Sequence, residues 1–532
     1  MRKVLLIGLP NKKGGSILLL LEFVLAMLPI IWLIVALSGL KMAGHKACVA
    51  ALALTAVLAG GYWGLDALCI ATAALEGVLN ALWPICLVIV AALFTYNLTL
   101  KTGAMESVKK MLAGVSSDKR VLALLIGWGF GNFMEGMAGF GTAVAIPASM
   151  LAAIGLDPIS AVLGCLVVNS TPTAFGSVGV PTVTLASVTG TDLTPLAGSV
   201  VTIQCILTFI SPFLMVCICG KGWRALKGMV PTTLVAAASF TAPWFFTAYF
   251  IGPELPDIIG SICSMGCIIA AAKIFNKEPN KEYAIQIAET EAGQKTMGIG
   301  EGLRAWSSFI LIFLFLMASS TLCPPIHNAI AGIKSTVAVY AGEGGNALSF
   351  SWINTPGVMI FLAAIIGGAV QGATFGDMAE VFLETLKKYW KTILTICSVM
   401  ATAKIMGYSG MISDIAKFLV AVTGSVYPLI APLIGALGAF VTGSGTSTCV
   451  LFGGLQSETA AALGLNATWM AAANVMGAGI GKMICPQGIA IGAGAVNMVG
   501  SESKILNKVF WYFLLYVIAA GIICYAGGLM GL

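Results

Sequence analysis

The stretch "GFGNFMEGMAGFGTAVAIPASM" (residues 129–150) places one carboxylate, Glu135, inside a long apolar tract that is rich in glycine. Gly136, Gly139 and Gly141 follow the acid closely. Moving a charge into hydrocarbon costs about 2.5–3.5 kcal/mol on insertion scales. The chain therefore needs a physical reason to keep Glu135 in this tract, and the sequence around it indicates what that reason is.

The rest of the chain is equally apolar. It has 532 residues, of which 58% are hydrophobic and 9% are charged, whereas an ordinary soluble domain carries about 25% charged residues. Apolar runs near 20 residues, the length that crosses about 30 Å of hydrocarbon, recur along the sequence. The runs are continuous and do not alternate in segments of about 10 residues as in a β-barrel. We therefore expect an all-α polytopic membrane protein with about 12–14 transmembrane elements.

Charge and cysteine patterns exclude several other functions. The net charge of +6 comes from short basic loops such as "VKKMLAGVSSDKR" (108–120), which fit the positive-inside rule better than nucleic-acid binding. The fourteen cysteines form no CxxC pair and no cluster with histidine, so we expect no metal site and no redox dithiol. The apolar runs at 47–63 and 83–100 predict two separate spans. His45 and His327 fall in predicted loops.

Two interrupted regions, one in each half of the chain, share the same order of features. The first half reads "EGMAGFGT" (135–142), "GLD" (155–157) and "NSTPTAFGSVGVP" (169–181). The second half reads "TGSGTST" (442–448), "GLN" (464–466) and "NVMGAGIGKMICPQG" (474–488). Interrupted segments at corresponding places in two halves indicate a transporter binding site, although Gly and Pro are also common in membrane helices generally. We therefore divide the chain into a first membrane half (1–275), a cytoplasmic polar loop (276–304) and a second membrane half (305–532).

A helix that is broken inside the membrane exposes backbone groups that lipid cannot satisfy, so a break must face protein or a water-filled cavity. The freed N–H groups can hold a small anion, and nearby hydroxyl and amide groups add polar contacts. The expected substrate-binding residues are Asn169, Ser170, Thr171, Thr173, Ser444, Thr446, Ser447, Thr448, Asn474, Lys482 and Gln487. Glycine lets the backbone approach a ligand closely. The expected backbone positions at the breaks are Gly136, Gly139, Gly141, Gly443 and Gly445.

Glu135 is compatible with the membrane if it lies at such a break. Because burial favours the uncharged form of a carboxyl group, Glu135 could take up a proton and serve in proton coupling. Two alternatives remain, a carboxylate that caps freed N–H groups and a simple interfacial position. Lys482 could attract an anionic substrate or pair with an acid, or it could extend from a helix end toward the interface.

These motifs resemble the bacterial L-lactate permease family. The resemblance rests on "GNFMEGMAGFGTAVAI" and "NSTPTAFGSVGVP", and continues through "IGPELPDII" (251–259), "LRAWSSF" (303–309), "YSG" (408–410), "FVTGSGTST" (440–448) and "GKMICPQGIAI" (481–491). It implies a multi-pass protein of the bacterial plasma (inner) membrane that imports L-lactate, with D-lactate and glycolate as related substrates, in symport with protons. It also implies kinship with transporters built from two inverted repeats with re-entrant hairpins and broken helices. A homodimer is one option for the assembled state.

The chain departs from the family pattern in the second break. The family commonly has an acidic residue where this chain has Gly445. If Gly445 replaces a proton-binding residue, either Glu135 carries the coupling alone or the coupling ion differs. The alternative function is therefore a sodium-coupled or otherwise coupled carrier of another small organic anion.

We do not expect an enzyme. "GSGTS" (443–447) superficially resembles a nucleophile loop, but a serine nucleophile needs a positioned base, and neither histidine is placed to serve. The sequence has no HExxH motif, and "MGAGIGKM" lacks the Ser or Thr and the glycine spacing of a P-loop. We therefore expect no catalytic residues and no cofactor, with a small monocarboxylate, protons and the lipid bilayer as the partners.

Overall fold

The computed structural model describes residues 13–36, 40, 42–139, 141–276, 282–284, 298–319, 323–345, 347–498 and 501–531. Within these residues, eight helices are long and apolar enough to cross a membrane, or nine when the bent pair of helices at residues 158–189 is included. The expected helical membrane fold is confirmed. Of the predicted loop at 276–304, residues 277–281 and 285–297 lie outside the described residues.

The described elements of the first half are all helices, and they follow one another with short turns. They are α2 (Lys13–Ile34), α3 (Gly44–Gly61), α4 (Ala67–Asn80), η2 (Ala81–Cys86), α5 (Leu87–Lys101), α6 (Ala104–Ala113), α7 (Lys119–Leu122), η3 (Ala123–Phe130), α8 (Gly131–Met137), α9 (Thr142–Ala153), α10 (Pro158–Val168), η4 (Pro172–Phe175), α11 (Gly176–Thr189), α12 (Leu193–Cys219), η5 (Trp223–Leu226), α13 (Val230–Phe250) and α14 (Pro256–Phe275).

The second half adds a small antiparallel sheet between two helices, in which Lys334 pairs with Ser351 and Val337 with Leu348. Its elements are α15 (Ile299–Ser319), α16 (Pro324–Ala331), β1 (Lys334–Val337), β2 (Leu348–Ser351), α17 (Pro356–Gln371), α18 (Phe375–Ser409), α19 (Met411–Thr423), η6 (Gly424–Val426), α20 (Tyr427–Thr442), α21 (Gly445–Leu463), α22 (Ala467–Lys482), α23 (Pro486–Ala495) and α24 (Glu502–Leu529).

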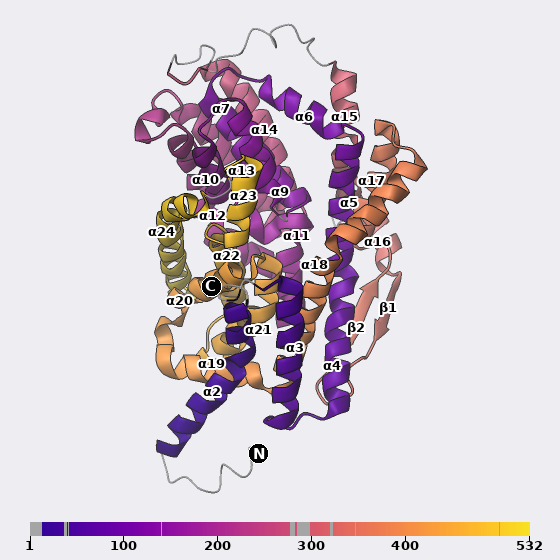
Figure 1. Ribbon diagram of the computed structural model, residues 1–532, viewed down its shortest axis with the longest axis vertical. Coiled ribbons are helices and arrows are strands. Elements are labelled where there is room, and N and C mark those ends of the chain that lie inside the picture. Colours follow the sequence, from indigo (N-terminus) through magenta and orange to yellow (C-terminus); the bar gives the residue numbers. More distant parts are fainter. Residues whose placement is uncertain are drawn as a thin grey trace.

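The helices pack into two groups, and each group takes helices from both halves of the chain. We call α3 to α6, α15, α17 and α18 the flanking group, and α8 to α14 with α20 to α24 the central group. Figure 1 shows α5, α15 and α17 on one side of the molecule and α10, α12 and α24 on the other. The two halves interlock in space, because each helix group contains helices of both. The division of the chain at 276–304 into two membrane halves stays a prediction.

The prediction of separate spans at 47–63 and 83–100 missed one helix. Residues Ala67–Lys101, which comprise α4, η2 and α5, form one apolar span of 35 residues that is kinked at Trp83, where the backbone angles (φ −131°, ψ 117°) are not helical. The start of this span was overlooked because it contains Glu76 and Asn80. Glu76 is fully buried, and its Oε1 lies 2.6 Å from Nζ of Lys404 on α18. An ion pair within the protein therefore lets a charged residue sit inside a membrane helix.

The two predicted Gly-Leu-Asx turns have the same local structure. Gly155 and Gly464 adopt left-handed backbone conformations with φ of +88° and +68°, which glycine adopts without steric cost. Asp157 then accepts a hydrogen bond from the Ser160 N–H at 3.0 Å and begins α10. Asn466 does the same for α22 through the Thr468 N–H at 2.9 Å. Each turn thus joins two apolar helices, and its Asx side chain satisfies part of the backbone N–H groups that a helix start leaves without a partner.

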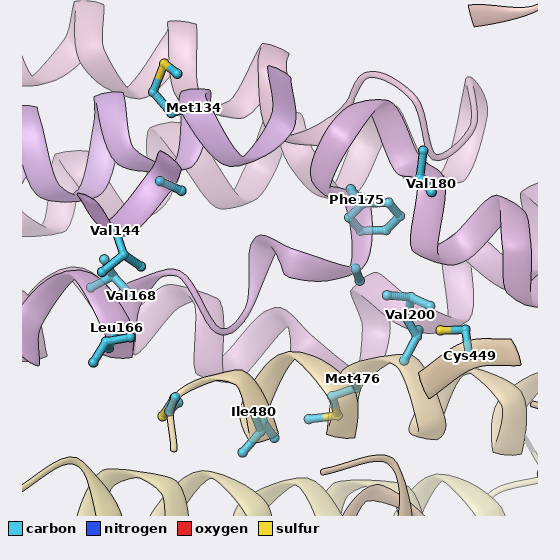
Figure 2. Packing of buried hydrophobic residues seen from close by; sticks show 14 of the residues in the cluster. Met134, Val144, Leu166, Val168, Phe175, Val180, Val200, Cys449, Met476 and Ile480 are labelled. Carbon is cyan, nitrogen blue, oxygen red and sulfur yellow. The ribbon is translucent and has the colours of Figure 1, made fainter. Parts of the chain in front are cut away.

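A continuous apolar layer joins the two halves inside the central group. Figure 2 shows Phe175 and Val180 of the first half next to a helix of the second half that carries Met476 and Ile480. All four side chains are at most 3% exposed. Close packing of this kind fixes the positions of the helix breaks that it surrounds.

Candidate functional site

A cavity of about 710 Å³ lies where the two interrupted regions meet, between the flanking and central groups. The central group contributes the breaks themselves, and the flanking group contributes the start of α3 and the middle of α18. The wall contains backbone from glycine positions together with hydroxyl, amide and charged side chains. This combination of a concave, partly open space and a few polar groups is typical of a small-molecule site.

The first break separates α8 from α9. Helix α8 ends at Met137 and α9 begins at Thr142. Gly139 and Gly141 reverse the chain with φ of +59° and +86°. Two carbonyl groups of the turn are satisfied by side chains, since Ser177 Oγ donates to Ala138 O at 2.8 Å and Thr142 Oγ1 donates to Gly139 O at 2.7 Å. The turn is therefore stable without continuing the helix.

The same half contains a second interruption, between α10 and α11. The two helices are bent by 62° around residues 169–171. Immediately after the bend, Ser177 and Val178 have φ of +48° and +58°, a region that β-branched residues rarely adopt. Backbone strain of this kind costs about 1–3 kcal/mol per residue and concentrates at functional sites. The strained segment lines the cavity through Gly176 and Ser177.

In the second half, α20 and α21 meet at Gly443 and Ser444. Gly443 has a φ of +70°, and Ser444 accepts a hydrogen bond from the Ser447 N–H at 3.2 Å to begin α21. Helix α22 ends at Lys482, and Pro486 begins α23 after a short interruption. Both predicted interruptions of this half are therefore present.

The breaks of the two halves are in contact. A Cβ atom on Gly445 would lie 3.3 Å from Thr173 Cγ2, and a Cβ on Gly479 of α22 would collide with the Ser170 carbonyl oxygen. Small residues permit this close approach of membrane helices. Since Thr173 and Ser170 belong to the first half and both glycines to the second, the chain brings its two polar regions to one place.

A buried ion pair connects the two breaks. Glu135 Oε1 lies 2.8 Å from Lys482 Nζ, and Asn169 Nδ2 donates to Glu135 Oε2 at 3.1 Å. The Glu135 side chain is 3% exposed and the Lys482 side chain 20%. These described hydrogen bonds of Glu135 go to side chains, so the carboxylate pairs with a cation and does not cap backbone N–H groups. Of the interpretations given to Lys482, pairing with an acid is the one observed.

Most of the expected site residues line the cavity. They are Glu135, Gly139, Gly141, Asn169, Thr173, Gly443, Ser444, Gly445, Thr446, Ser447, Lys482 and Gln487.

The remaining expected residues are buried behind this wall, where they pack or satisfy backbone groups. Ser170 Oγ donates to Val167 O, and Thr448 Oγ1 donates to Ser444 O. Asn474 accepts from Gln456 Nε2 at 3.4 Å, and Gly136 abuts Asp257. The Thr171 hydroxyl is buried without a hydrogen-bond partner.

Other cavity residues were not predicted, and four of them show why. Gly176 and Ser177 lie in the quoted motif "NSTPTAFGSVGVP", but they were not named among the expected site residues; in the structure both line the cavity. His45 and Lys391 reach the cavity from the flanking group. His45 was placed in a loop, whereas it is the second residue of α3. Contacts between separate helix groups leave no local signal in a sequence, so these two residues could not be found from spacing.

Comparison with known proteins agrees with this architecture. The family model described as "L-lactate permease" matches residues 22–528. The chain belongs to the L-lactate permease family. It is 42% identical over 455 residues to a protein from Streptococcus iniae named L-lactate permease, an alignment that covers 85% of this chain and 93% of that relative. It is 33% identical over 536 residues to the glycolate permease GlcA of Escherichia coli strain K12, covering 94% and 95% of the two chains.

A solved structure shares the fold. MtrF of Neisseria gonorrhoeae matches with a TM-score of 0.50 and 14% identity, over 91% of this chain and 95% of that one. Together with the family, the helical fold identifies this L-lactate permease family member as a multi-pass transport protein of the bacterial plasma membrane and not an enzyme. Its substrate is a small molecule.

Proposed function

We propose that the chain imports L-lactate, and also D-lactate and glycolate, across the plasma membrane by proton symport. The observation that carries this proposal is the ion pair between Glu135 and Lys482, because it links an acid that can accept a proton to a cation that can bind an anion. The names of the relatives, lactate and glycolate permeases, support the substrate class.

Charge balance explains how one pair couples proton and anion. With the cavity empty, Glu135 and Lys482 neutralise each other. A substrate carboxylate that binds Lys482 displaces Glu135, which would leave one net negative charge in a poorly solvated region unless Glu135 takes up a proton. Protonation of Glu135 without the anion would leave Lys482 unpaired. Because an uncompensated buried charge is strongly unfavourable, proton and anion bind together or not at all.

The wall of the cavity suits a 2-hydroxy acid. The Lys482 ammonium group would bind the carboxylate as a charge-assisted donor. Amide groups of Asn169 and Gln487 and the hydroxyl groups of the second break can donate to or accept from the 2-hydroxyl group. The two hydrogen-bond types that the substrate requires are therefore present on one surface.

The position of the cavity between two helix groups supports alternating access. Movement of the central group past the flanking group would expose the same site to either side of the membrane. The inverted repeats implied by the family resemblance would supply two related conformations.

The experiment is uptake of labelled L-lactate into vesicles that contain the purified protein, with a pH gradient or a sodium gradient imposed one at a time. Proton symport gives accumulation with the pH gradient alone. Glu135→Gln should abolish this accumulation and preserve some lactate exchange, because glutamine keeps the shape and cannot carry the proton. Glu380→Gln, in the exposed pair with Lys101, is the control. Unchanged accumulation in Glu135→Gln would remove that residue from the coupling role.

Sodium coupling is the second candidate, and Gly445 is the observation that favours it, because the family resemblance described above leads us to expect an acid there. In that case the sodium gradient alone drives accumulation. Competition by D-lactate, glycolate and other small acids in the same vesicles defines the substrate range.

A further inference from the structure

The start of α14 contains a buried acid that the Glu135–Lys482 pair does not use. Asp257 is 1% exposed, and its Oδ1 atom accepts a hydrogen bond from Trp244 Nε1 at 2.9 Å. Its Oδ2 atom is buried without a hydrogen-bond partner. A carboxylate oxygen in such a position is poorly stabilised as an anion. Asp257 therefore needs a bound proton or a bound cation.

Asp257 lies against the helix that carries Glu135. A Cβ atom on Gly136 of α8 would be 2.8 Å from Asp257 Cβ, and a Cβ on Gly129 would be 2.6 Å from Met265 Cγ. These two contacts show that the segment 129–136 and α14 run antiparallel in close contact. Since Gly136 directly follows Glu135, Asp257 is next to the coupling pair but outside the cavity wall.

Two further polar residues lie between these contact points. Asn132 is one helical turn from Gly136, and Ser261 is one turn from Asp257, so each shares a helix face with its neighbour. In the antiparallel pair the two residues lie at the same level on facing sides. Both are 0% exposed, and neither the Asn132 amide nor the Ser261 hydroxyl has a hydrogen-bond partner. Two unpartnered polar side chains and one unpartnered oxygen of Asp257 thus lie in one buried region.

The chemistry of this cluster fits a proton better than a metal ion. A neutral carboxylic acid accepts at its carbonyl oxygen and donates through its O–H group. Trp244 already supplies the donor for Oδ1. Asn132 and Ser261 each carry an oxygen that would accept the acid proton after a side-chain rotation, since neither is hydrogen-bonded to Asp257 in the structure. A hard metal cation would instead require a shell of oxygen ligands.

The surrounding charges also favour a proton. The elements packed closely on α14 are α13, α8, η3 and η4, and their described residues contain one charged side chain, Glu135. Lys482 is paired with Glu135, while Glu254 precedes α14 in the turn. The Tyr249 hydroxyl oxygen of α13 lies 3.0 Å from the Thr202 hydroxyl oxygen, so this titratable group already has a hydrogen-bond partner on α12. An ionised Asp257 would therefore add an uncompensated negative charge beside Glu135.

We infer that Asp257, with Asn132 and Ser261, forms a second proton-binding site that loads and unloads a proton during transport. On uptake, a hydronium ion on the cavity side loses a proton and one O–H bond forms at Asp257 Oδ2; on release that bond breaks and the proton returns to water on the cavity side, and no electrons are transferred. The inference rests on the proposed proton symport, because it assigns a second group to the same coupling process.

The first test compares Asp257→Asn with the wild-type protein in lactate-loaded and empty vesicles. Asparagine has the shape of a neutral aspartic acid and keeps an acceptor for Trp244. For one coupled proton, accumulation is about tenfold per pH unit imposed. Asp257→Asn should lose this accumulation and retain lactate exchange, because exchange of lactate for lactate needs no net proton movement. Wild-type accumulation in Asp257→Asn would overturn the inference, since it would make Asp257 a permanently neutral structural acid.

A second variant keeps the inference testable if Asp257→Asn does not fold. Ser261→Ala removes a predicted proton acceptor and leaves Asp257 in place, so the pH midpoint of lactate uptake should shift. Ser264→Ala is the matched control, because Ser264 lies on the same helix and is equally buried but donates to Ala236 O at 3.0 Å. Identical pH profiles for Ser261→Ala and the wild type would overturn the second site.

The outcome for the wild type separates the two proposals. If wild-type vesicles do not accumulate lactate when a pH gradient is imposed, proton symport is wrong, and the second proton-binding site is wrong as well. If the wild type accumulates lactate and Asp257→Asn accumulates it equally well, symport stands and only the second site is wrong.

Discussion

At the scale of single residues, the chain keeps a charge in the membrane by placing a countercharge next to it. Glu135 is 3% exposed and Lys482 20%, so the pair is reached mainly from the lysine side. This asymmetry suits an anion that approaches Lys482 through the cavity. The ion pair therefore explains both why the acid is tolerated and why it is useful.

Removing one partner of the pair should destabilise the protein. In Lys482→Gln, Glu135 becomes a buried charge without a countercharge, and the free energy of unfolding should fall by up to about 3–5 kcal/mol. The double variant Glu135→Gln/Lys482→Gln should recover most of this loss but should not transport lactate. Thermal unfolding of the purified variants at neutral pH measures the first effect, and vesicle uptake measures the second. Equal stability of the single and double variants would contradict a structural ion pair.

Gly176 lies next to the Glu135 carboxylate in space, and transport should be sensitive to a methyl group added at this position. A Cβ atom on Gly176 would lie 2.6 Å from Glu135 Oε1, and the backbone of Gly176 is otherwise compatible with alanine (φ −60°). Gly176→Ala should displace the carboxylate from Lys482 and reduce pH-driven uptake about tenfold or more, as misplacement by about 1 Å can do in an active site. Gly494→Ala is the control, because nothing lies within 4 Å of its added Cβ.

At the scale of elements, sequence patterns with a local cause were predicted well. The breaks at Gly139 and Gly141 and at residues 443–444, and the turns at Gly155 and Gly464, follow from glycine conformation and Asx capping, which act within a few residues. The polar start of α4 was missed, because Glu76 becomes compatible with a membrane helix only through Lys404, which is far away in sequence.

Long-range partners had no comparable signal. Glu135 and Lys482 were both singled out, but they are 347 positions apart, and nothing local indicates that they touch. A negative charge is favourable in the first turn of a helix, so the position of Asp257 just before an apolar run gives no sign in the sequence that it is buried. Only the packing of α14 against α8 reveals that its carboxyl group is buried.

The ion pair between α4 and α18 should stabilise the flanking group. Glu76 pairs with Lys404, and its carboxylate also accepts from the Tyr408 hydroxyl at 2.9 Å. Glu76→Gln should lower the free energy of unfolding by about 3 kcal/mol, because it leaves a partly buried lysine unpaired. Glu380→Gln breaks the exposed pair with Lys101 and should change stability little. Thermal unfolding compares the two, and similar losses would argue that burial of the pair is unimportant.

At the scale of the whole molecule, the cavity is formed by two bodies of helices and belongs to neither alone. The central group supplies the breaks and the ion pair, and the flanking group supplies His45 and Lys391 at its edge. A site shared in this way changes whenever one group moves relative to the other. The arrangement therefore couples binding to movement more directly than a pocket within one bundle would.

The exposed lysine at the edge of the cavity should attract the anionic substrate. Lys391 lines the cavity from α18, and a positive potential at an entrance raises the rate of anion arrival. Lys391→Glu should slow initial lactate uptake about twofold to tenfold at low ionic strength. The difference should largely disappear near 1 M salt, where the screening length is about 3 Å.

Lys388→Glu is the matched control for this experiment. Lys388 is also exposed and lies one turn earlier on α18, but it lines a separate pocket near Asn97 and Lys101. Initial uptake rates measured over a range of salt concentrations should therefore depend on salt differently in Lys391→Glu and Lys388→Glu. If both variants slow uptake equally at every salt concentration, the overall charge of α18 matters and the cavity edge has no special role in attracting the anion.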